Sequence, residues 1–321
     1  MPALKSETSL AKMNHQLSNT ILMVRPVDFS FNEETAKDNE FQHNPSGEDV
    51  NKKANNEFEN AVSILKKNGI NVLVLEKEPN YSPMPDAVFP NNWFGTDEAG
   101  NVHVFPMRTE NRRAETTQVD QAISLLETAG YQINNKMDWE EEFDANSVLE
   151  GTGSLVLDRK NKVVYAAISE RTQKKATEIF AEKLGYEPIL FQTRSSKGFP
   201  YYHTNVVMSI GEKMAVVCLE CIPNNIERMM VKFSLEISHE LITISIEQLE
   251  KGFCGNLLQV KNGKGKPITV LSQTAFNNLT DAQKEKMKTF GELVPIDIPT
   301  IEFVGGGSIR CMMAEIFLPK S

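Results

Sequence analysis

The fold of this chain is indicated by one stretch, residues 149–169, "LEGTGSLVLDRKNKVVYAAIS". Its two apolar runs flank a polar turn at residues 158–161, which predicts two short strands joined as a hairpin. Residues 171–186 have apolar side chains at helical spacing, and Gly185 is typical of a helix end. Residues 187–193, "EPILFQT", predict a third strand. The apolar helix face comprises Ala176, Ile179, Phe180 and Leu184.

The same order of elements recurs along the chain with a period of roughly 50–60 residues. A hairpin, a helix and a strand are predicted in residues 86–137, 203–245 and 253–298, where Asn262–Gly263 is a strong turn signal. A fifth unit is divided between the two ends of the chain, with one strand in residues 308–318 and the remainder in residues 21–76.

A unit shared by both ends would close the array into a ring. We therefore predict an α/β fold, a five-bladed α/β propeller of ββαβ-like repeats around a pseudo-five-fold axis, as one domain over residues 21–321. An ordinary α/β sandwich is the alternative. Residues 1–20 are polar and are expected to form a flexible leader without the apolar core of a secretory signal.

Composition narrows the function classes. Hydrophobic residues make up 40% and charged residues 24% of the 321 residues, as in globular proteins, and the net charge is −9. The negative charge argues against nucleic acid or an anionic membrane as partner. Only four cysteines are present, so a disulfide scaffold is not expected. We therefore expect a cytoplasmic location.

Each predicted first strand begins with small or polar residues. Equivalent positions of a ring converge on its axis, where buried polar groups are costly unless something uses them. Plain turns are the alternative explanation for the glycines and asparagines, but Glu150 and His203 are harder to explain in this way. The segments are Pro90-Asn91-Asn92, Glu150-Gly151-Thr152-Gly153, His203-Thr204-Asn205, Cys254-Gly255-Asn256 and Gly305-Gly306-Gly307-Ser308.

The combination "LEGTGS", "YYHTNVV" and "GGGSIRCMMAEI" resembles the guanidino-group-modifying enzymes, the amidinotransferase and arginine deiminase superfamily. Within it, "MVRPVDFSFNEETAKDNEFQ", "MPDAVFPNNWFGT" and "PMRTENRRAE" look most like the citrulline-utilisation hydrolases. The resemblance runs from about Ile21 to the C-terminus. It implies the five-bladed propeller called the pentein fold, in agreement with the repeat.

The resemblance also implies covalent catalysis at a carbon flanked by nitrogens. Cys311 would be the nucleophile, His203 the general acid and then the general base, and Glu150 the group that orients them. No cofactor and no metal are implied. Cys218 and Cys221 have the spacing of a redox or zinc pair, but they lie in an apolar strand without a second pair.

Two positions differ from arginine deiminases. Where those enzymes hold the guanidinium with aspartates, this chain has Asn92 and Asn205. An amide offers both donors and an acceptor, which suits a neutral ureido group better than a cation. We therefore expect hydrolysis of citrulline to ornithine, ammonia and carbon dioxide.

The amino-acid end of the substrate needs charged partners. Arg108, Arg112 and Arg113 are candidates for its carboxylate, with a solvated basic patch as the alternative. Asp86 is a candidate for the ammonium group. Further candidates near the N-terminus are Arg25 and Asn39.

Two other functions stay open at this stage. Arginine deiminase, or a related guanidino hydrolase, would act on the cationic substrate. A ribosome-binding factor can share the propeller without catalysis. The expected partner is a small amino acid, the sequence permits a homo-oligomer, and residues 28–55 are either a lid or a surface loop.

Overall fold

The computed structural model describes residues 15–45, 49–78 and 81–320. Within them, five three-stranded sheets each pair a middle strand antiparallel to one neighbour and parallel to the other. The sheets are β15 (Ala314–Glu315), β1 (Thr20–Val24) and β2 (Asn71–Leu75); β3 (Phe94–Thr96), β4 (Asn101–Val104) and β5 (Asn135–Asp138); β6 (Val156–Asp158), β7 (Val163–Ala167) and β8 (Glu187–Phe191); β9 (Met208–Ile210), β10 (Met214–Val217) and β11 (Glu240–Thr243); β12 (Leu258–Lys261), β13 (Pro267–Ser272) and β14 (Glu292–Ile296).

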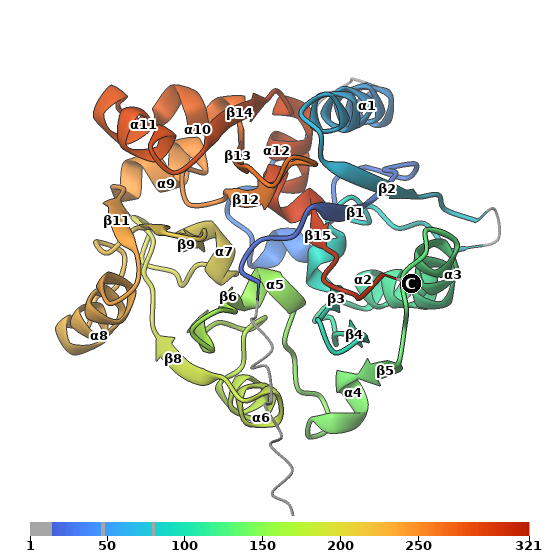
Figure 1. Ribbon diagram of the computed structural model, residues 1–321, viewed down its shortest axis with the longest axis horizontal. Coiled ribbons are helices and arrows are strands. Elements are labelled where there is room, and N and C mark those ends of the chain that lie inside the picture. Colours follow the sequence, from blue (N-terminus) through green and yellow to red (C-terminus); the bar gives the residue numbers. More distant parts are fainter. Residues whose placement is uncertain (1–14, 46–48, 79–80, 321) are drawn as a thin grey trace, which may run out of the picture.

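A helical segment joins the middle strand of every sheet to its parallel neighbour, as this crossover requires. Figure 1 shows these helices at the periphery of the molecule. They are α1 (Val50–Lys67), α3 (Val119–Thr128), α6 (Lys174–Leu184), α8 (Asn225–Glu236), and α10 (Gln273–Asn278) with α11 (Asp281–Lys288). The fold is therefore mixed α/β with small sheets, and the repeat predicted from the sequence is confirmed, including the unit shared by both ends of the chain.

Helix α6 illustrates how the apolar pattern positions a helix. Ala176, Phe180 and Ala181 are buried on one face, and Phe180 packs on the ring of Trp139. Gly185 ends the helix with φ +69°, a conformation that glycine adopts without strain. The helix begins three residues later than predicted, because Arg171 and Thr172 form a bridged turn before it.

The strand entrances differ from the prediction. Four of them are short helical turns: η2 (Pro90–Asn92), α5 (Gly151–Ser154), α7 (Thr204–Val207) and η4 (Ile309–Met312). Turn α5 contacts both η2 and α7, and η2 contacts η4. Figure 1 shows α5 and α7 near the middle of the molecule. Polar residues far apart in the sequence are thereby brought together.

The remaining helical segments connect these units. They are η1 (Thr35–Lys37), α2 (Glu110–Arg113), η3 (Ala114–Gln118), α4 (Trp139–Glu142), α9 (Ile246–Gly252) and α12 (Pro299–Gly305). In the described part of the chain, no helix combines the length and the apolar character that a membrane crossing needs.

Two boundaries require correction. Most of the predicted leader lies outside the described residues, but its last part is packed: Leu17 is buried and Ser18 donates to the Ile316 carbonyl at 2.6 Å. The segment considered a lid or loop ends earlier than residue 55, because Asp49 caps α1 through the Lys52 amide at 3.2 Å.

Candidate active site

A small cavity lies where the short helical turns meet. Its volume is only about 10 Å³, enough for about one water molecule. It is lined by Thr35, Asn39, Asp86, Phe89, Asn92, Arg112, Arg171, Tyr202, His203, Gly305, Gly307 and Cys311. The predicted nucleophile and general base therefore share one cavity although 108 positions separate them.

His203 is held by Glu150. Its Nε2 lies 2.7 Å from Oε2 of Glu150, and both side chains are buried. Burial alone would raise the pKa of Glu150, but Arg171, His203 and Arg112 outweigh it and lower that pKa to about 2. Burial lowers the pKa of His203 in spite of Glu150. The neutral ring therefore carries its proton on Nε2, because a carboxylate can only accept, and its Nδ1 remains basic.

Cys311 is placed by two amides. Nδ2 of Asn256 lies 3.3 Å from its sulfur and Nδ2 of Asn205 lies 3.4 Å away. Both amides can donate to a thiolate. Asn205 was predicted as a site residue, whereas Asn256 was only noted as one member of the repeated polar segments.

Asn92 has a defined orientation. Its Oδ1 accepts from Nη1 of Arg112 at 2.8 Å, and because a guanidinium has no acceptor, the amide cannot be reversed there. Arg112 is itself held by Glu115 through bonds of 2.8 and 2.9 Å. Nδ2 of Asn92 consequently points elsewhere and finds no hydrogen-bond partner in the described residues.

Asp86, which lines the cavity, and Asn205, whose Nδ2 contacts Cys311, each have one side-chain oxygen without a partner within the described chain. These oxygens are Oδ1 of Asp86 and Oδ1 of Asn205. The other oxygen of Asp86 accepts from Asn32 at 2.7 Å and from Thr35 at 3.0 Å, so the carboxylate is fixed. Buried polar groups are usually paired, and an unpaired set around one point indicates a place for a ligand.

Two predicted carboxylate anchors are not at the cavity. The side chain of Arg108 pairs with Glu170, although its backbone N–H donates to Glu150 at 2.9 Å. Arg113 is exposed and donates to the Met107 carbonyl at 3.1 Å. Helical geometry explains the position of Arg113, because Arg112 and Arg113 are neighbours in α2 and point in different directions, and Arg112 lines the cavity. Arg108 precedes α2, and its side chain is held by Glu170.

Arg171 was missed from the sequence. It is buried, lines the cavity, and pairs with Asp38 and at 3.7 Å with Glu150. Its guanidinium lies 5.0 Å from the centre of the Tyr202 ring. The sequence pattern assigned it to the start of a helix, where a charged residue is ordinary and gave no sign of a role in the cavity.

Glycines make room for these side chains. A Cβ on Gly153 would lie 2.4 Å from Nδ2 of Asn92 and 2.8 Å from Nδ1 of His203. Gly306 adopts φ +62°, and its carbonyl accepts from Tyr202 at 2.6 Å and from Asn39 at 3.2 Å.

The segment around η1 closes the cavity. Thr35 and Asn39 line it, and Asn39 ties the segment to the glycine run before Cys311. Arg25, the other N-terminal candidate, lies outside the cavity at a partly exposed site. It pairs with Glu76 at 2.6 Å and with Glu59. Cys218 and Cys221 lie in the core, and Cys221 donates to the Cys218 carbonyl at 3.0 Å.

Residues 25–318 match the family described as eukaryotic N,N dimethylarginine dimethylhydrolase. The chain belongs to this family. The membership confirms the predicted resemblance to the guanidino-group-modifying superfamily. The family description names a hydrolase, and the membership indicates that this chain is a hydrolase acting on C–N bonds.

Solved structures show the same fold at low identity. An apo structure of ArgZ, a cyanobacterial arginine dihydrolase, matches with a TM-score of 0.66 and 14% identity, covering 94% of this chain and 40% of that one. The ternary complex of AgrE with ornithine and NAD+ matches with a TM-score of 0.69 and 16% identity, covering 94% of this chain and 40% of that one. A mutant of DDAH from Pseudomonas aeruginosa, complexed with citrulline, matches with a TM-score of 0.64 and 13% identity, covering 94% of this chain and 100% of that one.

The chain thus spans only part of the first of these relatives, while it spans 99% of a structure of the N-terminal domain of ArgZ. No curated protein matches the sequence significantly.

Proposed function

We propose that this protein hydrolyses the ureido group of citrulline to ornithine, ammonia and carbon dioxide. Cys311 is the nucleophile, His203 transfers protons, and Glu150 orients His203. The observation that carries the choice of substrate is a set of three unpaired buried atoms, one donor on Asn92 and two acceptors on Asp86 and Asn205. Asn92 and Asp86 line the cavity with Cys311, and the Asn205 amide contacts the Cys311 sulfur.

The first half of the reaction forms a bond to sulfur. Nδ1 of the neutral His203 takes the proton from the Cys311 thiol, and the sulfur attacks the ureido carbon. His203 then gives this proton to the terminal nitrogen, which leaves as ammonia. The amides of Asn205 and Asn256 stabilise the negative charge on sulfur before attack.

The second half breaks that bond. His203 removes a proton from water, which attacks the thiocarbamate carbon, and returns it to the departing sulfur of Cys311. The released carbamate of ornithine loses carbon dioxide. The overall change is citrulline plus water to ornithine, ammonia and carbon dioxide, so no oxidant or reductant is needed.

The unpaired atoms match a ureido group in kind, because they include both a donor and acceptors. Nδ2 of Asn92 can donate to the ureido oxygen, and the oxygens of Asp86 and Asn205 can accept from its N–H groups. A guanidinium has donors only and would place a donor against Asn92.

Arg112 and Arg171 are proposed to bind the substrate carboxylate, in place of Arg108 and Arg113. Both are buried at the cavity and both present a planar fork of donors. Their existing partners leave little room, so the segment carrying Thr35 and Asn39 must move to admit the substrate. Asp86 remains the candidate for a positively charged or N–H-bearing part of it.

Guanidino hydrolysis is the second candidate, because Asp86 retains one carboxylate at the cavity with an unpaired oxygen. Arginine deiminase activity would use it to hold the guanidinium. ArgZ, which shares the fold, is an arginine dihydrolase, and this also makes arginine a substrate to test.

Citrulline, arginine, agmatine and dimethylarginine incubated separately with the full chain, followed by chromatography of the products, test the proposal. We expect ornithine and ammonia from citrulline, with a higher kcat/KM than any guanidino compound. Faster conversion of arginine would favour the second candidate, and turnover of none of the four would refute both.

We also propose that the five sheets form a five-bladed propeller around a pseudo-five-fold axis, as a single catalytic domain over residues 21–321. The equal strand order of all five sheets and the mutual contacts of the helical turns support it. A cytoplasmic location is supported by four free, buried cysteines.

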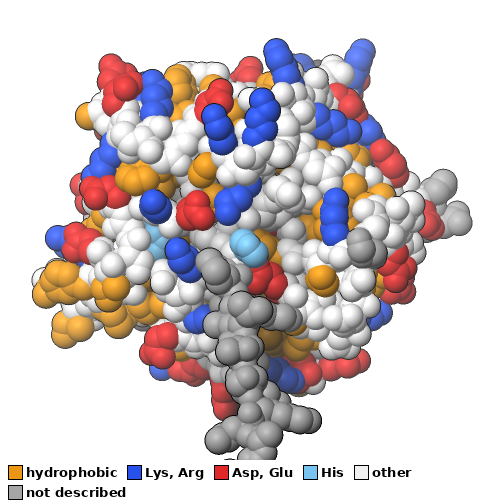
Figure 2. All heavy atoms as spheres, in the orientation of Figure 1, with side chains coloured by type: hydrophobic (Ala, Val, Ile, Leu, Met, Phe, Trp, Pro, Cys, Tyr) orange, Lys and Arg blue, Asp and Glu red, His pale blue; other side chains and the backbone are white. Residues whose placement is uncertain are grey.

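A homo-oligomer is proposed through α8. Its outer face exposes Ile226, Met229, Met230, Phe233 and Ile237, the first and last to 79% and 84%. Figure 2 shows apolar side chains gathered at the left edge, where α8 lies. Because isoleucines stand at both ends of this face, two antiparallel copies of α8 can cover each other. The exposed apolar area of the face is on the order of several hundred Å². Light scattering should show a dimer that Phe233→Glu converts to a monomer; a monomeric parent protein would contradict this.

A further inference from the structure

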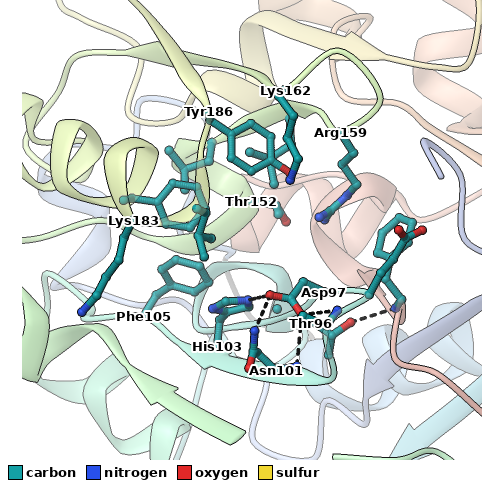
Figure 3. Close-up of a pocket in the computed structure, with 18 of the residues that line it drawn as sticks. Thr96, Asp97, Asn101, His103, Phe105, Thr152, Arg159, Lys162, Lys183 and Tyr186 are labelled. Atoms are coloured by element: carbon teal, nitrogen blue, oxygen red, sulfur yellow. Dashed lines mark hydrogen bonds and ion pairs between the residues drawn. The ribbon is translucent and has the colours of Figure 1, made fainter. Parts of the chain in front are cut away.

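A second and larger pocket is lined in part by Thr152 of turn α5. It has a volume of about 300 Å³, within the range of small-molecule sites. None of its lining residues lines the catalytic cavity. Figure 3 shows Arg159, Lys162 and Tyr186 on one side of it, and Phe105 and His103 on the opposite side.

Most charged groups of this pocket are already paired. Both oxygens of Asp97 accept hydrogen bonds, from the Ala99 and Asn101 amides, from Nδ2 of Asn101 and from Nε2 of His103, at 2.8 to 3.1 Å. Glu98 pairs with His15 at 2.6 Å. Lys183 pairs with Glu142. These groups are therefore held in place by partners within the described chain, and Asp97 stays ionised because its pKa is lowered to about 2.

Arg159 and Lys162 are different. Neither forms an ion pair with a carboxylate anywhere in the described chain, although both line the pocket. The Arg159 guanidinium lies 4.1 Å from the centre of the Phe317 ring, and Nζ of Lys162 lies 4.4 Å from that of Tyr186. Burial and the neighbouring Arg159 lower the pKa of Lys162, although Asp97 and Glu98, which also line the pocket, act in the opposite direction.

The backbone of Lys162 has an unfavourable conformation. Lys162 adopts φ +57°, which is uncommon for a residue with a side chain. It follows the turn at residues 158–161, where Asn161 binds Asp158 through both its backbone and side chain, at 3.1 and 2.8 Å. A lysine is an unusual choice at such a position, where glycine or asparagine would cost less, unless its charge is used.

The remaining walls are flat and apolar. Phe105, Phe180 and Leu184 form one side, with Phe317 and Tyr186 beside the two cations. We propose that this pocket is a second ligand site, which binds a small aromatic carboxylate or similar organic anion between its rings, with the anionic group at Arg159 and Lys162.

Such a ligand would touch the frame of the catalytic site. Thr152 lines the pocket and belongs to α5, the turn that directly follows Glu150. Its hydroxyl donates to the Asn91 carbonyl at 3.3 Å, next to Asn92. The two sites therefore share a backbone segment without sharing a side chain.

Calorimetric titration of the full chain with 1-naphthoate, and with neutral 1-naphthamide, tests this site. We expect naphthoate to bind about tenfold or more tightly than the amide, the effect of one charge-assisted hydrogen bond. Arg159→Gln and Lys162→Asn should each weaken naphthoate binding by about the same factor. Asparagine is chosen at 162 because it tolerates a positive φ.

Lys160→Gln is the matched control, since Lys160 is an exposed cation of the same turn that does not line the pocket, and its binding constant should equal that of the parent chain. Thermal melting verifies that each variant is folded, and two independent variants keep the test valid if one is not. Absence of naphthoate binding at millimolar concentration, equal binding of the amide, or unchanged binding in both folded variants would overturn the proposal.

Discussion

Asn92→Asp changes the one atom on which the choice between citrulline and arginine depends. The side chain keeps its shape, and the oxygen that accepts from Arg112 at 2.8 Å stays in place. The unpaired Nδ2 becomes a carboxylate oxygen, so a donor to the ureido oxygen is replaced by a second acceptor. The substitution therefore alters hydrogen bonding and charge with little change in volume.

The magnitude follows from the contacts. Loss of a buried donor leaves the ureido oxygen unpaired, which costs about 1–3 kcal/mol, and the opposed oxygens add to this cost. We expect kcat/KM for citrulline to fall about a hundredfold. A guanidinium gains a charge-assisted bond of about 1.5–3 kcal/mol, so the preference for citrulline over arginine should shift by on the order of a thousandfold.

The assay is the initial rate of ammonia release from each substrate, with ornithine measured in parallel. Asn60→Asp makes the same chemical change on the exposed face of α1 and should leave both rates unchanged. If Asn92→Asp left the ratio of the two kcat/KM values as it is in the parent chain, the reasoning from Asn92 would be refuted.

Three other predictions follow from the site. Gly153→Ala should reduce kcat at least a hundredfold in a folded protein, because its Cβ would displace His203 and Asn92. Gly263→Ala is the control and should leave kcat unchanged, because a Cβ there would lie 3.6 Å from its nearest neighbour. Equal kcat values for the two variants would contradict this. Arg171→Gln should raise KM for citrulline about ten- to a hundredfold, and an unchanged KM would exclude Arg171 as the carboxylate anchor. The pKa of Glu150 is lowered to about 2, so its ionised form stabilises the fold above about pH 4.5 and this contribution is lost as the pH falls through 2. Urea unfolding of the parent chain should show this loss on acidification. Glu150→Gln should show a smaller loss, because only the contribution of other carboxylates such as Asp97 remains; parallel curves would contradict the assignment.

The apolar periodicity was sufficient to predict all five sheets and the helix of each unit, because buried faces repeat at the spacing of strands and helices. It could not predict the helical turns at the strand entrances. Gly151 and its neighbours look like strand starts or plain turns, and only tertiary contact makes them helical.

The proposed catalytic residues could be named from the sequence because each stands in a short motif. The partners of the substrate could not, since their roles depend on side-chain direction. Arg112 and Arg113 are adjacent in the sequence, yet one is buried beside Asn92 and the other is exposed. Arg171 enters the cavity only because the chain turns before α6.

The central claim is a covalent bond between citrulline and Cys311, and mass spectrometry of the acid-quenched protein tests it most directly. During turnover, the peptide that contains Cys311 should gain the mass of citrulline less that of ammonia, and Cys311→Ser should show neither adduct nor turnover. Steady production of ornithine by the Cys311→Ser variant, or an adduct on another residue of the parent chain, would contradict the account.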